Sequence, residues 1–517
     1  MTHALPVNGV VGPATWRTCA PRPASIRCTT LPRVTDLMRR SAVELAALIR
    51  ERELSARELV QASLDAIAER DRQVNAFTHV ADETALAEAE RVDATLSAAD
   101  ADERPFAGVP IAIKDNRAVA GMPLTMCSEI FGSFTPTEDA HCVRRLREAG
   151  FVIVGKTALP EFGILPTTES RRHGPTANPW DPTRTPGGSS GGAGAAVAAG
   201  MVPIAHGNDG GGSIRIPAAC CGLVGLKPAR GRVSVGPDAG QSFLVCDGVL
   251  TRDVADTAAV LDALAGYEAG DASWAPPPAA PFAHALERGS WTGGQRIALV
   301  LEPALDGAPV DPTCIDAARD AAELLSGLGH EIIEVPAPWT NLGLLATFTA
   351  AFGPLSATGV AMGGRLAGRE PTAEDVEPLT WQMYELARNQ STLAYLEAQT
   401  TLEVAARRFV SFMLDYDAVL TPALGMRPVK TGEIHGRGPD PLDHFRRSGD
   451  FTPYTAIANV TGQPAVSIPL YHGEDGLPLA VQLIGPPAGE EILIGLAAQL
   501  ERAHPWSDRT PEAFSAS

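Results

Sequence analysis

The chain has 517 residues, 45% of them hydrophobic, so it has enough apolar material for one large domain or two modest ones, and wholesale disorder is excluded. Its 61 acidic and 42 basic residues give a formal net charge of −19, which disfavours binding to the phosphates of nucleic acids. The eight cysteines form no CxxC pair, and no apolar run approaches the roughly 18 residues of a membrane span. We therefore expect a cytoplasmic protein that binds neither nucleic acid nor membrane.

Residues 1–37 differ in composition from the rest of the chain. They are rich in Pro, Arg and Thr, poor in acids, and lack the central apolar block of a secretory signal. A transit peptide is one interpretation of this composition, and a disordered extension is the other, which we favour. We expect one large domain over residues 38–510.

The predicted elements begin with a helical pattern over 41–99, where Ser41–Glu44 and Ser55–Glu58 match the capping box. Two buried strands, at 109–113 and 151–154, flank a helix near 138–149. A segment dense in Gly, Ser and Pro follows, from 175 to 228, and 269–295 has the composition of a surface connection. Later strands alternate with helices, at 297–301, 331–335, 418–420, 465–468 and 479–483. This order predicts an α/β fold with a mixed, twisted sheet sandwiched between helices.

Two short motifs in the chain are misleading. Residues 150–157 match the phosphate-binding pattern GxxxxGK[ST], but the four residues between the glycines, Phe-Val-Ile-Val, form an apolar strand rather than an open loop. Residues 187–191 match the GxSxG elbow, which requires a strand before the serine, and here Thr-Arg-Thr-Pro precedes it. No paired metal-ligand spacing occurs, so neither a metal nor another cofactor is predicted.

The most informative segments are 186–200 and 207–217, where glycines alternate with small and apolar residues. Three consecutive glycines, Gly210, Gly211 and Gly212, precede Ser213, and such a run lets several backbone N–H groups converge on one anion. This is the environment that an oxyanion hole requires next to a serine nucleophile. No histidine has the context of a general base, so a neutral lysine is the candidate base.

These segments resemble the amidase signature family, whose pattern runs GGSSGG and then, after about twenty residues, G-T-D-x-G-G-S-I-R-x-P. The distance from Ser189 to Ser213 fits that pattern, and Lys114 matches the family's strand lysine. Further blocks match in the same order, so the resemblance covers about residues 40–505; they are 178–181, 221–228, 417–422, 459–464 and 476–482.

The resemblance implies a Ser–cisSer–Lys triad and the amidase signature fold. Ser213 would be the nucleophile, Ser189 the bridging serine in a cis peptide, and Lys114 the base, with its pKa lowered by burial. The oxyanion hole would be formed by the N–H groups of Gly210, Gly211, Gly212 and Ser213. Asp209, Arg215 and Ser190 would support the loops, and two other lysines, Lys156 and Lys227, would be structural.

Departures from the family pattern concern the substrate. Asn208 replaces the usual Thr, and Gly210 replaces a larger residue, as in the subgroup that includes 6-aminohexanoate cyclic dimer hydrolase. The tentative substrate contacts are Cys127, Ser128, Phe162 and Ile164. Apolar residues dominate the segments expected to form the acyl site, namely Phe162, Ile164, Leu165, Leu342, Leu345, Phe348 and Phe352.

The leading hypothesis is an amidohydrolase that cleaves a small or medium-sized apolar amide, lactam or carbamate through an acyl-enzyme on Ser213. Its partner would be a small-molecule amide, and the protein would be a monomer or a homodimer. The alternatives are the glutaminase subunit of a tRNA-dependent amidotransferase and a non-catalytic binding module of the same family.

Overall fold

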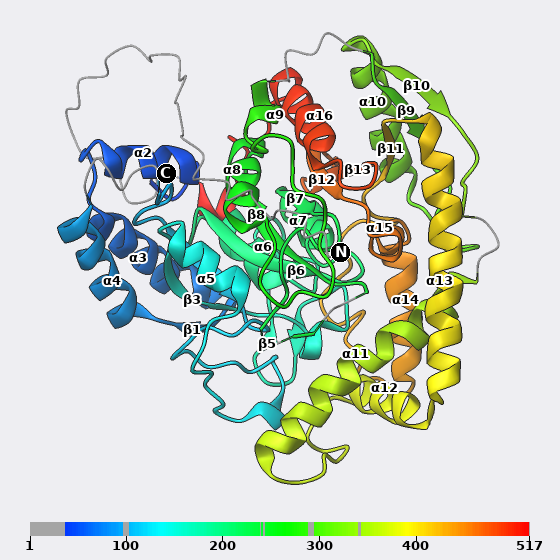
Figure 1. Cartoon of the computed structure of the whole chain (residues 1–517), viewed down its shortest axis with the longest axis horizontal. Coiled ribbons are helices and arrows are strands. Elements are labelled where there is room, and N and C mark those ends of the chain that lie inside the picture. Colours follow the sequence, from blue (N-terminus) through cyan, green and yellow to red (C-terminus); the bar gives the residue numbers. More distant parts are fainter. Residues whose placement is uncertain are drawn as a thin grey trace, which may run out of the picture.

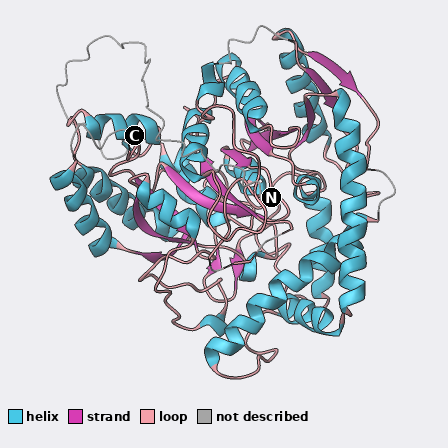
Figure 2. Ribbon diagram, viewed as in Figure 1, coloured by secondary structure: helices cyan, strands magenta, loops and turns pink. Residues whose placement is uncertain are grey.

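A mixed sheet of 11 strands runs through the centre of the molecule, with helices packed around it (Figures 1 and 2). This computed structural model describes residues 37–515, apart from 97–102, 238, 241–242, 288–293 and 340–342. The strand order across the sheet is β1-β3-β2-β6-β8-β7-β12-β13-β11-β9-β10. The large sheet is formed by β1 (Phe77–Val80), β2 (Pro110–Lys114), β3 (Val152–Thr157), β6 (Ile204–Asp209), β7 (Val224–Lys227), β8 (Cys246–Thr251), β9 (Arg296–Leu299), β10 (Glu331–Glu334), β11 (Ala418–Pro422), β12 (Ala465–His472) and β13 (Pro478–Ile484).

Parallel pairs occur towards both ends of this sheet and antiparallel pairs in its middle. On one side β3, β2 and β6 are parallel, on the other β11, β9 and β10, and the strands between them are antiparallel. A separate short pair consists of β4 (Glu169–Ser170) and β5 (Gly174–Pro175). The prediction of one large α/β domain with a mixed sheet is therefore confirmed.

Of the described helices before β9, five pack on strands of the sheet. Both predicted capping boxes form, since the Ser41 and Ser55 side chains each accept from the backbone N–H of the glutamate three residues later. The helices before β9 are α2 (Ala42–Arg50), α3 (Ala56–Val74), α4 (Asp82–Thr95), α5 (His141–Glu148), α6 (Gly191–Ala198), α7 (Arg215–Cys221), α8 (Val254–Leu264) and α9 (His284–Glu287). The five that pack on the strands are α3, α4, α6, α7 and α8.

The later helices include a layer of long helices, α11 to α14, on the right of Figure 1. In this layer α11 packs against α12 and α13, and α12 packs against α14. The later helices are α10 (Pro312–Gly327), α11 (Leu344–Ala367), α12 (Pro378–Asn389), α13 (Thr392–Phe412), α14 (Pro441–Phe451), α15 (Ala456–Thr461) and α16 (Glu490–Ala503).

One helix corrects the expectation that no apolar run is long enough for a membrane span. Within the described residues, Leu345–Ala367 of α11 has the length and composition to cross a membrane. In the folded domain this helix packs against α12 and α13, and three of its residues line the cavity beside Ser213. About 22% of this apolar stretch is buried within the domain.

Each strand predicted above overlaps an observed strand, and the misleading phosphate-binding match is explained. Val152, Ile153 and Val154 of that match lie on β3, a fully buried strand, and Phe151 directly precedes it. A Cβ added at Gly155 would lie 2.3 Å from the backbone oxygen of His79, so this glycine allows β1 to approach β3 closely. The sequence analysis missed β1, β7 and β8. Residues 1–36 lie outside the described part of the chain.

The order of the strands places the carboxyl ends of β2 and β6 together. The two strands are parallel neighbours, with Ile111 opposite Ile204 and Ala112 opposite Ala205. Continuing this register brings Lys114, the last residue of β2, next to the end of β6. In open α/β sheets, sites form at the carboxyl ends of neighbouring parallel strands.

Candidate active site

Lys114 and Ser189 meet in the interior of the protein. Lys114 is fully buried at the end of β2, and Ser189, 2% exposed, lies in the loop before α6. The Lys114 Nζ atom donates to Ser189 Oγ at 2.7 Å. The peptide bond between Gly188 and Ser189 is cis, in agreement with the expectation from the family pattern.

Burial lowers the pKa of Lys114 from 10.5 to about 7. The largest cause is the loss of hydration of the charged ammonium, and the carboxylate of Asp209 partly opposes it. Arg117 lowers the pKa further, and Asp247 raises it. An amine with this pKa is substantially neutral at neutral pH, which a general base requires.

Asn208, on β6, is a further partner of Lys114 that the sequence analysis noted only as a departure from the family pattern. Its side-chain oxygen Oδ1 accepts a hydrogen bond from Lys114 Nζ at 2.7 Å. The side chain is buried, since Asn208 is only 6% exposed. In the sequence, Asn208 lies close to the expected nucleophile loop, which indicates a place near the site. Its contact with Lys114 could not be predicted, because it depends on the pairing of β6 with β2.

Ser213 lies in the turn between β6 and α7, at the wall of a cavity. It is partly exposed, whereas the residues around it are mostly buried. The N–H of Ser190 donates to the backbone oxygen of Ser213 at 3.2 Å, and the Ser190 hydroxyl donates to the backbone oxygen of Asn208 at 3.2 Å. Ser190 thus ties the loop of Ser189 to the loop of Ser213.

A buried ion pair holds the loop of Ser213 in shape. Asp209 and Arg215 are both fully buried, with Arg215 Nε 2.9 Å from Asp209 Oδ2. The Asp209 carboxylate also accepts from the N–H groups of Gly212 and Ile214, at 2.7 and 3.2 Å. Although burial opposes it, the Arg215 guanidinium holds the pKa of Asp209 well below its usual range. Neither side chain lines the cavity, so their geometry is that of loop support.

The N–H of Gly212, one of the four expected donors of the oxyanion hole, forms a hydrogen bond within the protein. It donates to Asp209 Oδ1 at 2.7 Å, and Gly212 has a φ of +133°, so this residue also shapes the turn. Of the other three expected donors, Gly210, Gly211 and Ser213, the last two line the cavity.

The cavity beside Ser213 contains about 820 Å³ of free space, including its open mouth. Its described lining contains no Asp, Glu, Lys, Arg or His side chain. The rings of Phe348 and Phe352 are stacked with centroids 5.3 Å apart, and Phe445 continues the stack at 6.4 Å from Phe352. The walls are therefore largely apolar and aromatic, which suits an uncharged ligand.

The structure places some of the expected substrate contacts in the wall of this cavity and others outside it. Of the tentative contacts only Ile164 lines the cavity, and Cys127, Ser128 and Phe162 do not. Cys127 is buried, which raises the pKa of its thiol, and the Ser128 hydroxyl donates to the buried carboxylate of Glu161 at 2.6 Å. Phe162 packs against Phe131 instead. The other predicted lining residues that are described, Leu165, Leu345, Phe348 and Phe352, do line the cavity, and Leu342 lies outside the described residues.

The two other lysines considered above, Lys156 and Lys227, bind other partners. Lys156 is buried, forms an ion pair with Asp115 at 3.1 Å and donates to the backbone oxygen of Arg117 at 2.9 Å. Lys227 donates to the backbone oxygen of Pro228 at 2.7 Å. Both are placed as structural residues rather than as partners of the serines.

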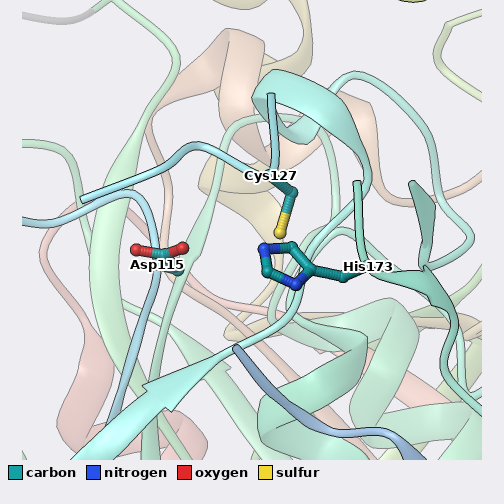
Figure 3. A group of neighbouring side chains, drawn as sticks. All are labelled: Asp115, Cys127 and His173. Carbon is teal, nitrogen blue, oxygen red and sulfur yellow. The ribbon is translucent and has the colours of Figure 1, made fainter. Parts of the chain in front are cut away.

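Two groups of side chains within the described residues have atoms close enough to bind a metal ion. One consists of Asp115, Cys127 and His173, whose side chains converge in Figure 3. There the carboxylate is already paired with Lys156, and burial favours the protonated thiol. In the other group, Cys142, His206 and Asp247, the carboxylate accepts two hydrogen bonds from Arg117 at 2.9 and 2.8 Å. In both groups the carboxylate is therefore already paired with a basic side chain of the protein.

Comparisons with known proteins agree with this geometry. The profile of the family described as Amidase matches residues 58–494. The 6-aminohexanoate-cyclic-dimer hydrolase of Paenarthrobacter ureafaciens is 35% identical over 92% of this chain and 97% of its own. A glutamyl-tRNA(Gln) amidotransferase subunit of Acidothermus cellulolyticus is 38% identical over 91% of this chain and 95% of its own. A solved structure of 6-aminohexanoate cyclic dimer hydrolase superposes with a TM-score of 0.86 at 34% identity, over 92% of this chain and 99% of that one.

Proposed function

The chain belongs to the amidase signature family and is a hydrolase acting on carbon–nitrogen bonds other than peptide bonds, and from that premise we propose a mechanism and a substrate class. It cleaves an uncharged, small or medium-sized apolar amide, lactam or carbamate through an acyl-enzyme on Ser213. The observation that carries the proposal is the buried hydrogen bond from Lys114 to Ser189, next to the turn that presents Ser213 to the cavity.

In the proposed acylation step, Ser213 Oγ attacks the carbonyl carbon of the amide. The proton of Ser213 passes to Ser189 while the proton of Ser189 passes to the neutral amine of Lys114. The N–H groups of Gly210, Gly211 and Ser213 stabilise the oxyanion that forms on the carbonyl oxygen. The carbon–nitrogen bond then breaks, and the leaving amine takes a proton back along the same route.

Deacylation repeats these steps with water. Lys114, neutral again, removes a proton through Ser189 from a water molecule that attacks the ester carbonyl carbon. Breakdown of the second tetrahedral intermediate releases the carboxylic acid and returns a proton to Ser213. No cofactor enters the balance, because water supplies both the hydroxyl group of the acid and the proton of the amine.

The uncharged lining of the cavity supports one substrate class over the other. Free glutamine carries an α-ammonium and an α-carboxylate, and its desolvation in a cavity needs charged or polar partners. The described lining offers none that is charged, and its largest side chains are Phe348, Phe352 and Phe445. An apolar amide therefore fits the site better than glutamine does. The similarity to an amidotransferase keeps the glutaminase as the function to test against.

The remaining properties proposed are those of a cytoplasmic enzyme with a small-molecule substrate. The protein would act as a monomer or homodimer, with residues 38–510 as the functional domain and residues 1–37 as a dispensable extension. Lys114, Ser189 and Ser213 are all retained, which favours a catalyst over a non-catalytic binding module.

The proposal is tested by kinetics and by covalent labelling. The purified chain should hydrolyse a p-nitroanilide or an aryl carbamate with a higher kcat/KM than glutamine, and a fluorophosphonate should label Ser213. Ser213→Ala should remove both the labelling and the activity, because no other group can carry the acyl intermediate. Glutamine as the best substrate would favour the amidotransferase interpretation, and labelling at Ser189 would reverse the assignment of the nucleophile.

A further inference from the structure

The amine of Lys114 has two oxygen partners, and only one of them belongs to the proposed triad. Lys114 Nζ lies 2.7 Å from Ser189 Oγ and 2.7 Å from Asn208 Oδ1. The partners lie on different elements, since Ser189 precedes α6 and Asn208 is the penultimate residue of β6. The amine is therefore held between a loop and a neighbouring strand.

The two oxygens differ in what they can do for a neutral amine. A neutral lysine has two N–H groups and one lone pair, and the lone pair must face Ser189 Oγ–H for a proton to be transferred. A serine hydroxyl can both donate and accept, whereas a side-chain amide oxygen can only accept. Asn208 Oδ1 therefore binds an N–H of Lys114 and never its lone pair. One of the three positions around the nitrogen is thereby fixed, and the lone pair is kept off the side that faces β6.

The absence of a charge on Asn208 matters as much as its oxygen. The charged and titratable groups that act on the amine lie on the surrounding elements: Asp209 on β6, Asp247 on β8, Arg117 after β2, Cys127 in the following loop and His206 on β6. The carboxylates of Asp209 and Asp247 raise the pKa of Lys114, and the guanidinium of Arg117 lowers it. A carboxylate at position 208, in direct contact with Nζ, would act like Asp209 and Asp247 and raise the pKa of Lys114. An amide supplies the acceptor without that charge.

We propose that Asn208 is a positioning residue for the catalytic base: its amide oxygen orients the amine of Lys114 towards Ser189 without placing a negative charge beside that amine. This inference rests on the proposed function, because it assigns Asn208 a role in proton transfer through Ser189. Asn208 does not line the cavity, so it acts through Lys114 rather than on the substrate.

The test is the pH dependence of kcat/KM for a p-nitroanilide in two variants of nearly equal shape. Asn208→Asp places a carboxylate against the ammonium and should move the acidic limb about 1 to 3 pH units to the alkaline side. Activity at pH 7 should then fall about tenfold or more and recover above pH 9. Asn208→Leu removes the acceptor, so kcat on the plateau should fall about tenfold or more while KM changes little and the limb does not move to alkaline pH.

A matched control separates contact from general electrostatics. Asn116→Asp makes the same substitution two residues after Lys114, at a side chain whose buried oxygen has no hydrogen-bond partner. Its limb should shift much less than that of Asn208→Asp. Three results would each overturn the inference. The first is an equal shift of the limb in Asn208→Asp and Asn116→Asp, and the second is a limb in Asn208→Asp within 0.3 pH unit of the wild type. The third is a plateau kcat in Asn208→Leu within about twofold of the wild type.

One further measurement keeps the result interpretable. The rate at which a fluorophosphonate labels Ser213, followed across the same pH range, reports activation of the nucleophile without turnover and should show the same limb. If Asn208→Asp does not fold, Asn208→Leu and its labelling rate still decide the question. A wild type that neither hydrolyses amides nor labels at Ser213 contradicts the proposed function instead, and so differs from every outcome that contradicts the role of Asn208.

Discussion

Replacing Lys114 by Met should abolish activity and make the stability of the protein depend differently on pH. The lowering of the Lys114 pKa from 10.5 to about 7 corresponds to about 5 kcal/mol of free energy that folding costs at low and neutral pH. The sign follows from proton binding. Below pH 7 both states carry the proton, and the buried charge penalises the folded state by the full amount. Between pH 7 and 10.5 only the unfolded chain holds the proton, so the penalty falls as the pH rises. The penalty disappears as the pH rises to 10.5.

Methionine has a similar length and no charge, so Lys114→Met removes this penalty. It also leaves Ser189 Oγ and Asn208 Oδ1 without their shared donor, at a cost of about 1 to 3 kcal/mol each. The two effects nearly cancel at pH 7, where the variant should lie within about 3 kcal/mol of the wild type. At pH 9.5 the charge penalty is mostly gone, and the variant should be clearly less stable.

The assay is urea-induced unfolding of both proteins at several pH values between 7 and 9.5. The wild type should gain about 1.2 kcal/mol per pH unit relative to the variant over this range. Lys156→Met is the matched control, because it deprives Asp115 of its buried ion-pair partner and should cost about 3 to 5 kcal/mol at every pH tested. A difference between wild type and Lys114→Met that does not change with pH would refute the reasoning.

Two further predictions concern the nucleophile turn and the pH–rate profile. Gly212→Ala should lower kcat about 100-fold or more, because the new Cβ would lie 2.4 Å from Thr455 Oγ1 and 2.6 Å from Ile216 Cδ1 and displace the turn of Ser213. Gly211→Ala, whose Cβ would meet Phe348 at 3.3 Å, should have a milder effect, and equal losses in steady-state assays would contradict this account. The kcat/KM of the wild type should rise with pH around pH 7, the pKa of Lys114. Survival of the same limb in residual Lys114→Ala activity would identify another group as the base.

The sequence predicted the elements whose signals are local. Ser41 and Ser55 carry the capping boxes of α2 and α3, and these form as expected. The strands β2, β3, β11 and β13 are short apolar runs that can be recognised without knowing their neighbours. By contrast, β8 contains an Asp, a Gly and a Thr among its six residues, and it is a strand because β6 and β7 pair with it on either side.

Some features of the candidate site could be predicted from the sequence and others could not, for the same reason. Ser189 and Ser213 lie in one continuous segment, so the motif alone predicts their spacing. The partner of Lys114 on β6 depends on which strands are neighbours, and the use of the Gly212 N–H depends on where the Asp209 carboxylate turns. Neither can be obtained from spacing alone. The tentative contact at Cys127 also depends on the fold, because the structure buries this residue away from the lining of the cavity.

The proposed catalytic residues and the aromatic wall of the cavity come from different parts of this chain. Lys114, Asn208 and Ser213 lie on or next to β2 and β6, in the half of the sequence where the motifs are dense. The aromatic wall of the cavity comes from Phe348 and Phe352 on α11 and from Phe445 on α14, which lie in the outer helical layer. On the proposed function, substitutions in that layer should change which amide fits while leaving the pKa of Lys114 unchanged, because none of the groups named above as acting on this amine lies there. The motif residues would then cleave the bond, and the choice of substrate would depend on how α11 and α14 pack over the site.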